Sequence, residues 1–135
     1  MLKTHLQFAS SQFPIIPGED EETNPGIYGR ALAQFLEDQL NEEGYRAGAI
    51  AEDWGYCVTL GDAPFLSFVG CSSYGDEGEW LVFIEPSKPV VRKLFKKIDA
   101  TPWIGKLAET LERVLRDQGG AQNIRWWDDR ESGRN

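Results

Sequence analysis

Apolar and polar residues alternate through the middle of the chain, which is the pattern of half-buried β-strands. The pattern predicts six strands, at residues 4–8, 45–51, 54–60, 65–71, 79–85 and 121–127. Residues 65–71 and 79–85 are apolar on both faces, so we expect central strands that are covered on both sides. Within residues 54–60 every second residue is large and apolar, and these side chains should face the core. They are Trp54, Tyr56, Val58 and Leu60.

Three other segments repeat their apolar residues with the helical period of 3.6. The first begins at Asn24-Pro25, an N-cap followed by a first-turn proline, and ends at Gly44. The third begins with the same signal at Thr101-Pro102 and ends at Gly119-Gly120. The second spans Ser87–Ile98 and separates an apolar side from a basic side. The apolar side holds Val90, Val91, Leu94, Phe95 and Ile98, and the basic side holds Arg92, Lys93, Lys96 and Lys97.

This order of elements predicts an α+β fold: a strand, a helix, four strands, two helices and a final strand. Short links between strands favour antiparallel neighbours. We therefore expect a mostly antiparallel sheet of five to six strands with three helices packed on one face. Residues 1–127 should form a single domain, and residues 128–135 a polar C-terminal tail.

Charge is unevenly distributed between the two parts of the chain, whose formal net charge is −8. Residues 1–87 hold 15 acidic and 3 basic residues, while residues 88–135 hold 7 acidic and 11 basic. This excess of negative charge disfavours nucleic acid as a partner, because that affinity depends on Lys and Arg displacing counterions. The acidic run at residues 19–22 is expected to be a solvated loop. Its carboxylates are stabilised by the partial positive charge at the N-terminus of the first helix.

The sequence offers few signals for common catalytic classes. The single histidine, His5, has no accompanying nucleophile motif, and no glycine-rich phosphate loop follows a strand. Cys57 and Cys71 lack the number and spacing of a disulfide framework or a zinc site, so both should be reduced, half-buried thiols. We expect no cofactor and no metal. With neither a secretory signal nor a membrane-spanning segment, a cytoplasmic protein is predicted.

Two candidate sites have alternative interpretations. Glu52-Asp53-Trp54-Gly55-Tyr56 joins two carboxylates to two large aromatics. Either Trp54 and Tyr56 enter the core and the carboxylates occupy a corner, or Glu52 or Asp53 lies beside aromatic walls that raise its pKa for acid–base chemistry. The basic side of the second predicted helix, with Lys88, is either a solvated face or a binding surface. Its partner would be an acidic protein or, as less favoured alternatives, nucleic acid or anionic lipid.

Three stretches of the chain resemble a family of small uncharacterised bacterial proteins. They are Asn24-Pro25-Gly26-Ile27-Tyr28-Gly29-Arg30, Glu52-Asp53-Trp54-Gly55-Tyr56 and Ile124-Arg125-Trp126-Trp127. The resemblance spans most of the chain and implies a bacterial, single-domain protein. It carries over no activity and no site residues.

The sequence favours a small acidic protein-binding or regulatory module, such as an inhibitor or immunity protein, that uses an acidic surface and has a protein partner. The alternative hypothesis is a small enzyme or ligand binder with a pocket near Asp53 and Trp54. A concave pocket holding these residues would favour the enzyme, and a flat or convex acidic surface would favour the module. Nucleic-acid binding by residues 88–97 is a third hypothesis. The oligomeric state is left open.

Overall fold

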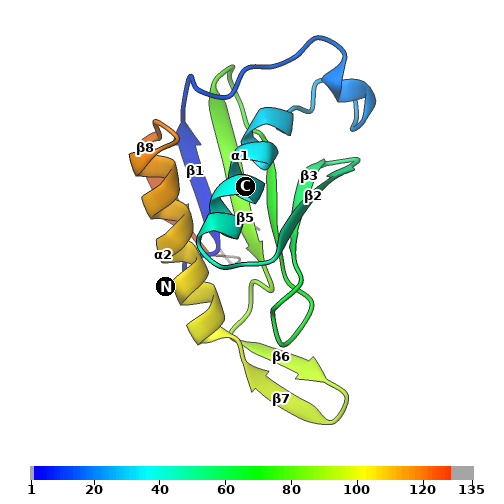
Figure 1. The fold of residues 1–135 in the computed structure, drawn as a ribbon, viewed down its shortest axis with the longest axis vertical. Helices are drawn as coiled ribbons and strands as arrows, with labels where there is room; N and C mark the ends of the chain where they lie inside the picture. The colour runs from blue at the N-terminus through cyan, green and yellow to red at the C-terminus, as the bar shows by residue number, and fades with distance from the viewer. Residues whose placement is uncertain (1, 129–135) are drawn as a thin grey trace.

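The fold is built on a six-stranded antiparallel sheet with two helices on one of its faces, as Figure 1 shows. The structure is a computed structural model that describes residues 2–128. The strands are β1 His5–Ala9, β2 Ala47–Glu52, β3 Gly55–Leu60, β4 Phe68–Ser73, β5 Glu79–Glu85 and β8 Gln122–Trp127. They lie in the order β2-β3-β4-β5-β1-β8, and every neighbouring pair is antiparallel. The α+β class and the mostly antiparallel sheet are therefore confirmed.

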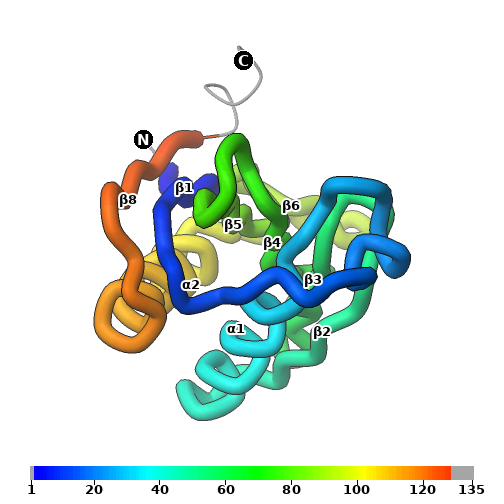
Figure 2. The backbone as a smooth tube through the Cα atoms, turned by 90° about the horizontal axis from the view of Figure 1, so that it is seen from above, coloured from blue at the N-terminus to red at the C-terminus, as the bar shows by residue number. Residues whose placement is uncertain are grey.

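The core lies between the sheet and its helices, α1 Arg30–Glu42 and α2 Thr101–Asp117. Figure 2 shows both helices on the same side of the strands. Alternate residues of β3 point into this layer, and Tyr56, Val58 and Leu60 are at most 4% exposed. Their predicted core positions are confirmed. Among the described residues, no helix is long and apolar enough to cross a bilayer.

The predicted helix at Ser87–Ile98 is wrong, because this segment forms a β-hairpin. Its strands are β6 Val90–Lys93 and β7 Lys96–Asp99, and they pair only with each other in the described sheet order. The sequence is nearly symmetric about Leu94-Phe95, so Val91 lies opposite Ile98. A mirror-symmetric hairpin with a two-residue turn places apolar residues at spacings of three, four and seven. That spacing is also the helical signal, so periodicity could not separate the two structures.

The first helix begins at Arg30, five residues after the predicted first helical residue, Pro25. Its N-terminus is capped by Glu19, which lies in a short 3-10 helix, η1 Glu19–Glu21. One Glu19 oxygen accepts the N–H groups of Gly29 (3.1 Å) and Arg30 (3.3 Å), and the other accepts that of Ile16 (2.9 Å). Glu19 is only 3% exposed, so the acidic run is not simply a solvated loop. Distant capping of this kind has no local sequence signature.

The other helix ends agree more closely with the sequence. Gly44 follows α1 with a φ of 98°, the left-handed conformation expected there. The helix α2 begins at Thr101 with a proline in its first turn, and its capping carboxylate is Asp99, which accepts the Thr101 N–H at 3.0 Å. Two described helices and one 3-10 turn therefore replace the three predicted helices.

The sheet has one face packed against α1 and α2 and a second face, which we name the uncovered face, on which neither described helix packs. The strands β4 and β5 are central, as predicted, but their second face holds half-buried Phe68, Leu81 and Phe83 and carries no helix among the described residues. The edge strand β2 is protected differently. The side chain of Asn41 bonds to both backbone groups of Ala47, and Glu37 accepts the Ala49 N–H at 2.9 Å. These contacts occupy groups that could otherwise pair with another strand.

Candidate functional site

The Glu52–Tyr56 cluster forms the tight turn between β2 and β3. Asp53 and Trp54 are the turn residues, and Gly55 opens β3 with a φ of 150°. A Cβ atom at Gly55 would lie 2.5 Å from the Cys71 carbonyl oxygen and 2.8 Å from the Ser72 Cβ. The glycine is therefore needed so that two strands can approach closely beside the turn.

This turn packs against the segment that precedes α1. The Asn24 side-chain amide donates to the Asp53 carbonyl at 3.0 Å, and the Tyr56 hydroxyl donates to Glu22 at 3.0 Å. Arg30 lies 3.8 Å from the same Glu22 carboxylate. Two stretches that are far apart in sequence thus form one unit, which we name the corner: residues 19–30 and 52–56. All of these bonds are internal to the corner, so their polar groups serve the fold.

Tyr56 illustrates the electrostatics of the corner. Burial, together with the hydrogen bond to Glu22, raises the pKa of Tyr56 to about 12. The phenol therefore keeps its proton at neutral pH and acts as a hydrogen-bond donor. It joins the core of the sheet to the loop that caps α1.

Trp54 does not enter the core, contrary to the alternation pattern. It is 38% exposed and lies on the uncovered face, with its ring centroid 5.2 Å from Phe83 and 6.3 Å from Phe68. Gly70 lies beneath Phe83 and leaves space for that ring, since a Cβ at this position would overlap it. As a turn residue, Trp54 does not follow the inward alternation of β3, which explains the wrong prediction.

The two cysteines lie on opposite faces of the sheet, since Cys57 pairs with Gly70 and Cys71 pairs with Tyr56. Both are free thiols and both are buried, more fully than the half-buried state predicted. Burial and the nearby Glu52 raise the pKa of Cys57 to about 11, and burial raises the pKa of Cys71 well above its usual range. Both thiols are protonated at neutral pH, which removes their nucleophilicity.

The other end of the uncovered face carries a second aromatic group. His5 is stacked between Phe83 and Trp127, and β1 lies inside the sheet, so His5 is not an edge residue. The Arg125 guanidinium lies 4.9 Å from the Trp127 ring centroid. The indole N–H of Trp127 is buried and has no hydrogen-bond partner among the described residues. The members of this aromatic group do not line the grooves along α2, along the hairpin or beside the β4–β5 turn.

The β6–β7 hairpin projects from the body of the protein, as Figure 1 shows. Leu94 and Phe95 form its tip and are 92% and 105% exposed. Its base is anchored, because Val91 and Ile98 pack against the core. Near the tip, the Lys93 ammonium donates to the Pro64 carbonyl at 3.2 Å. A base that packs against the core thus presents two large apolar side chains to solvent.

Three features of this hairpin act against its stability. Arg92 lies opposite Lys97, and Lys93 lies opposite Lys96, so like charges face each other across the two strands. Leu94 has a φ of 57°, a conformation that bulky residues rarely adopt. The exposed tip also gains nothing from burial. Such costs at one place are typical of a surface that is shaped for binding.

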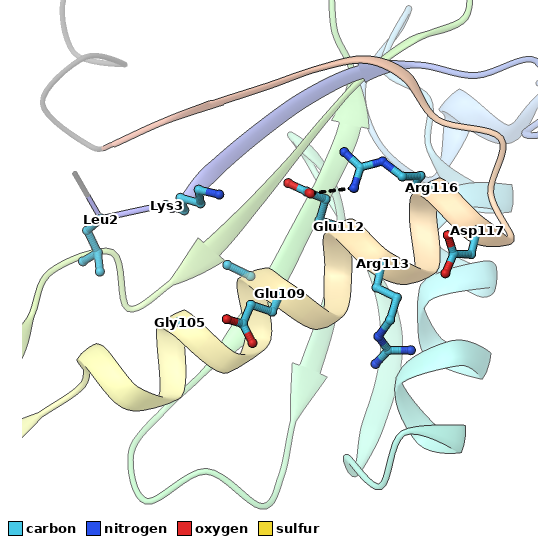
Figure 3. A pocket seen from close by; sticks show the side chains of 9 residues that line it. Leu2, Lys3, Gly105, Glu109, Glu112, Arg113, Arg116 and Asp117 are labelled. Atoms are coloured by element: carbon cyan, nitrogen blue, oxygen red, sulfur yellow. Dashed lines mark hydrogen bonds and ion pairs between the residues drawn. The ribbon is translucent and has the colours of Figure 1, made fainter.

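Surface grooves lined by described residues lie along α2, along the hairpin and beside the β4–β5 turn. The first, of about 560 Å³, follows the outer side of α2 near the N-terminus and is drawn in Figure 3. One ion pair lies within its lining, since Glu112 accepts a hydrogen bond from Arg116 at 2.8 Å. Glu112 also accepts the Trp126 indole N–H at 2.6 Å, and the pKa of Glu112 is lowered first by this bond and then by Arg116. The second groove lies along the hairpin, and its lining residues are Pro64, Lys93, Leu94, Phe95, Lys96 and Ile98.

The third groove, of about 450 Å³, lies beside the β4–β5 turn. Its apolar lining comes from Ile15, Tyr28 and Trp80, and its acidic lining comes from Asp76, Glu77 and Glu79. We name it the acidic groove. Gly26, Ser73, Gly75 and Gly78 complete its wall.

The structure separates the predicted site residues into two groups. Glu52, Asp53, Trp54 and Tyr56 belong to the corner, while the cations of residues 88–97 belong to the hairpin, and Figure 1 shows these elements apart. The predicted single basic face is wrong, because strand alternation places Arg92 and Lys97 on one side and Lys93 and Lys96 on the other. Sequence reasoning missed Leu94 and Phe95 as an exposed tip. The near-mirror symmetry of the sequence around these two residues was the signal that could have indicated a hairpin with an exposed turn.

Within the described residues, no group of three or more His, Cys, Asp or Glu side chains is arranged to hold a metal ion. Comparisons of the chain with protein-family models, with curated proteins and with solved structures find no match. Function must therefore be inferred from the geometry of the chain itself.

Proposed function

We propose that the protein is a small protein-binding module whose contact element is the β6–β7 hairpin. The observation that carries this proposal is the complete exposure of Leu94 and Phe95 at a tip surrounded by cations. Aromatic and aliphatic side chains that fill a partner's pocket dominate the energetics of protein interfaces. An exposed phenylalanine on an anchored hairpin is suited to that role.

The charge around the tip indicates the chemistry of the partner. Residues 88–97 contain five basic residues and no acidic ones. Among the described residues, none of these five side chains forms an ion pair within the chain. A partner with an apolar pocket and an acidic rim would bury the tip and relieve the repulsion between facing cations. An inhibitor or immunity role would use the same element, with the tip inserted into a partner's cleft.

The grooves lined by described residues give no support to the alternative of a small enzyme at the corner. None of the three grooves is lined by Glu52, Asp53 or Trp54. Asp53 is exposed, and its backbone carbonyl is bound by Asn24. Catalysis by paired carboxylates needs both groups to face a substrate-sized cleft. The geometry supports a structural role for the corner instead.

The test compares three forms of the full-length protein as bait. The wild type is matched with Leu94→Ser/Phe95→Ser, which removes the apolar tip, and with Leu66→Ser, which removes an 87% exposed leucine outside the hairpin. Proteins that are captured from a lysate of the source cells are identified, purified and titrated by calorimetry. We expect the tip variant to lose at least tenfold in affinity and Leu66→Ser to bind as the wild type does.

Two outcomes would contradict the proposal. If the tip variant keeps its fold, as checked by circular dichroism, and binds the purified partner with unchanged affinity, then the hairpin is not the contact element. If the bound species is instead nucleic acid, the affinity will fall steeply with salt and will depend on the cations rather than on Phe95.

A further inference from the structure

The acidic groove lies at the opposite end of the molecule from the hairpin. In Figure 1, β5 runs from the β4–β5 turn, which borders the acidic groove, toward the segment that leads into β6. The hairpin of one molecule therefore cannot reach its own acidic groove. It can reach the groove of a second molecule.

The hairpin and the acidic groove are complementary in charge and in polarity. The hairpin presents Leu94 and Phe95 between Lys93 and Lys96. The groove has an apolar lining of Ile15, Tyr28 and Trp80 and an acidic lining of Asp76, Glu77 and Glu79. Asp76 and Glu77 are exposed, so their carboxylates are accessible to an approaching lysine. This is the apolar pocket with an acidic rim that the hairpin requires.

The other two grooves do not have this complementarity. The groove along α2 contains Arg113 and Arg116 as well as acidic residues, and several of its charges are already paired with neighbours. The groove along the hairpin contains Lys93 and Lys96, which would repel a second hairpin. Only the acidic groove, among these three, combines an apolar lining with charge of a single sign opposite to that of the hairpin.

We propose that this protein associates with itself head to tail, with the hairpin tip of one copy seated in the acidic groove of the next. This inference rests on the proposed function, because it uses the hairpin as the contact element and identifies a second copy as its partner. Leu94 and Phe95 cover Ile15 and Tyr28, while Lys93 and Lys96 face Asp76 and Glu77. The overall charge of −8 opposes association, and the local charges of the two surfaces favour it.

A head-to-tail contact has a distinctive consequence. The two surfaces that meet are different, so each copy keeps one unused hairpin or groove until a ring closes or a filament grows. The assembly should therefore grow with protein concentration rather than stop at a symmetric dimer. It should also weaken as salt is added, because the lysine–carboxylate pairs lie near the surface.

The experiment is sedimentation velocity on the full-length protein over a wide concentration range at low salt. Two charge reversals each damage one surface: Lys93→Glu/Lys96→Glu in the hairpin and Asp76→Lys/Glu77→Lys in the groove. The matched control for the groove reversal, Asp38→Lys/Glu42→Lys, makes the same change in charge on α1, away from both surfaces. We expect the wild type and the control to assemble. Each reversed variant alone should need at least a tenfold higher protein concentration to assemble.

Mixing separates this arrangement from general charge effects. The intact hairpin of the groove variant fits the intact groove of the hairpin variant, and the two reversed surfaces are also opposite in charge. An equimolar mixture should therefore regain assembly, with the two variants alternating. Placing both reversals in one chain restores opposite charges and should restore assembly. A wild type that stays monomeric at every concentration would overturn the inference. So would assembly that survives the groove reversal, or loss of assembly in the α1 control.

Failure of this inference is distinguishable from failure of the proposed function. A monomeric wild type whose tip variant still loses its captured partner overturns self-association and leaves the hairpin as the contact element. A tip variant that retains the captured partner overturns the proposed function. Assembly that survives the hairpin reversal overturns the inference as well.

Discussion

The corner and the hairpin are both dense in charged and aromatic residues, but they differ in where those residues direct their interactions. In the corner, Glu19, Glu22 and Asn24 each bind another part of the chain. In the hairpin, the tip residues Leu94 and Phe95 are almost fully exposed. The polar groups of the corner form hydrogen bonds within the chain, whereas the large apolar side chains of the hairpin tip are exposed to solvent.

This contrast shows that an unusual cluster in a sequence is not by itself a binding site. The Glu52–Tyr56 turn combines carboxylates, aromatics and a glycine because two strands, a helix start and a loop meet there. The hairpin sequence has the residue pattern of an amphipathic helix. Which groups can bind a partner depends on which of them remain without contacts after folding. Substitutions in the corner should therefore reduce stability, and those in the hairpin should reduce binding.

The largest effect is expected at Gly55 in the corner. Gly55→Val would place a branched side chain against the Cys71 carbonyl oxygen and Ser72, at a backbone φ of 150°. We expect a loss of about 4 kcal/mol in the free energy of unfolding, from overpacking together with backbone strain. Urea denaturation followed by tryptophan fluorescence measures it.

Gly26 provides the matched control for this substitution. It also has a positive φ, 82°, but a Cβ atom at this position would have no neighbouring atom within 4 Å. Gly26→Ala should cost only about 1 kcal/mol. Equal losses at the two positions would show that close packing against β4 is not what requires Gly55.

A smaller loss of stability is expected at Glu19. Glu19→Ala would leave the N–H groups of Ile16, Gly29 and Arg30 without their carboxylate partner, and these groups lie near a buried helix start. We expect a loss of about 3 kcal/mol, measured by thermal and urea unfolding. Glu21→Ala, at an exposed position in the same 3-10 helix, should change stability by less than about 0.5 kcal/mol. A solvated role for Glu19 would make the two variants equivalent.

Tyr56 should give the corner a sensitivity to alkaline pH. Its pKa is raised from 10.0 to about 12 in the folded protein, so the folded state holds this proton more tightly than the unfolded state. The associated stability is complete below pH 10 and is lost as pH rises toward 12. Tyr56→Phe should cost about 1 kcal/mol at neutral pH and should reduce the slope of stability between these values. An unchanged slope in the variant would assign the alkaline transition to other groups.

The smallest effect on stability is expected at the hairpin tip, and its sign is opposite. Leu94→Asn places a residue that tolerates positive φ at the 57° position, so stability should rise by roughly 0.5 kcal/mol. Binding through the tip should weaken in the same variant. Phe95→Asn is the control, because Phe95 has no positive φ and its replacement should weaken binding without the gain in stability. Loss of stability in Leu94→Asn would indicate that the tip supports the fold.

Local sequence patterns determined much of the architecture. The short apolar run at residues 79–85 predicted β5 with its observed bounds, and the strands at both ends of the chain were predicted to within one residue. The glycine at position 44 and the proline at position 102 indicated helix ends that the structure confirms to within one residue. These features depend on near neighbours in the chain, which is why one sequence suffices to predict them.

Tertiary structure alone decided the rest, because the deciding contacts join residues that are distant in sequence. The start of α1 depends on Glu19, which is ten residues from Gly29 along the chain. The position of Trp54 depends on Phe83, a residue of a non-adjacent strand. The hairpin could be distinguished from a helix only by its pairing, because its mirror symmetry reproduces the helical period. The same pairing exposes Leu94 and Phe95, so the proposed contact element also follows from the three-dimensional structure rather than from the pattern.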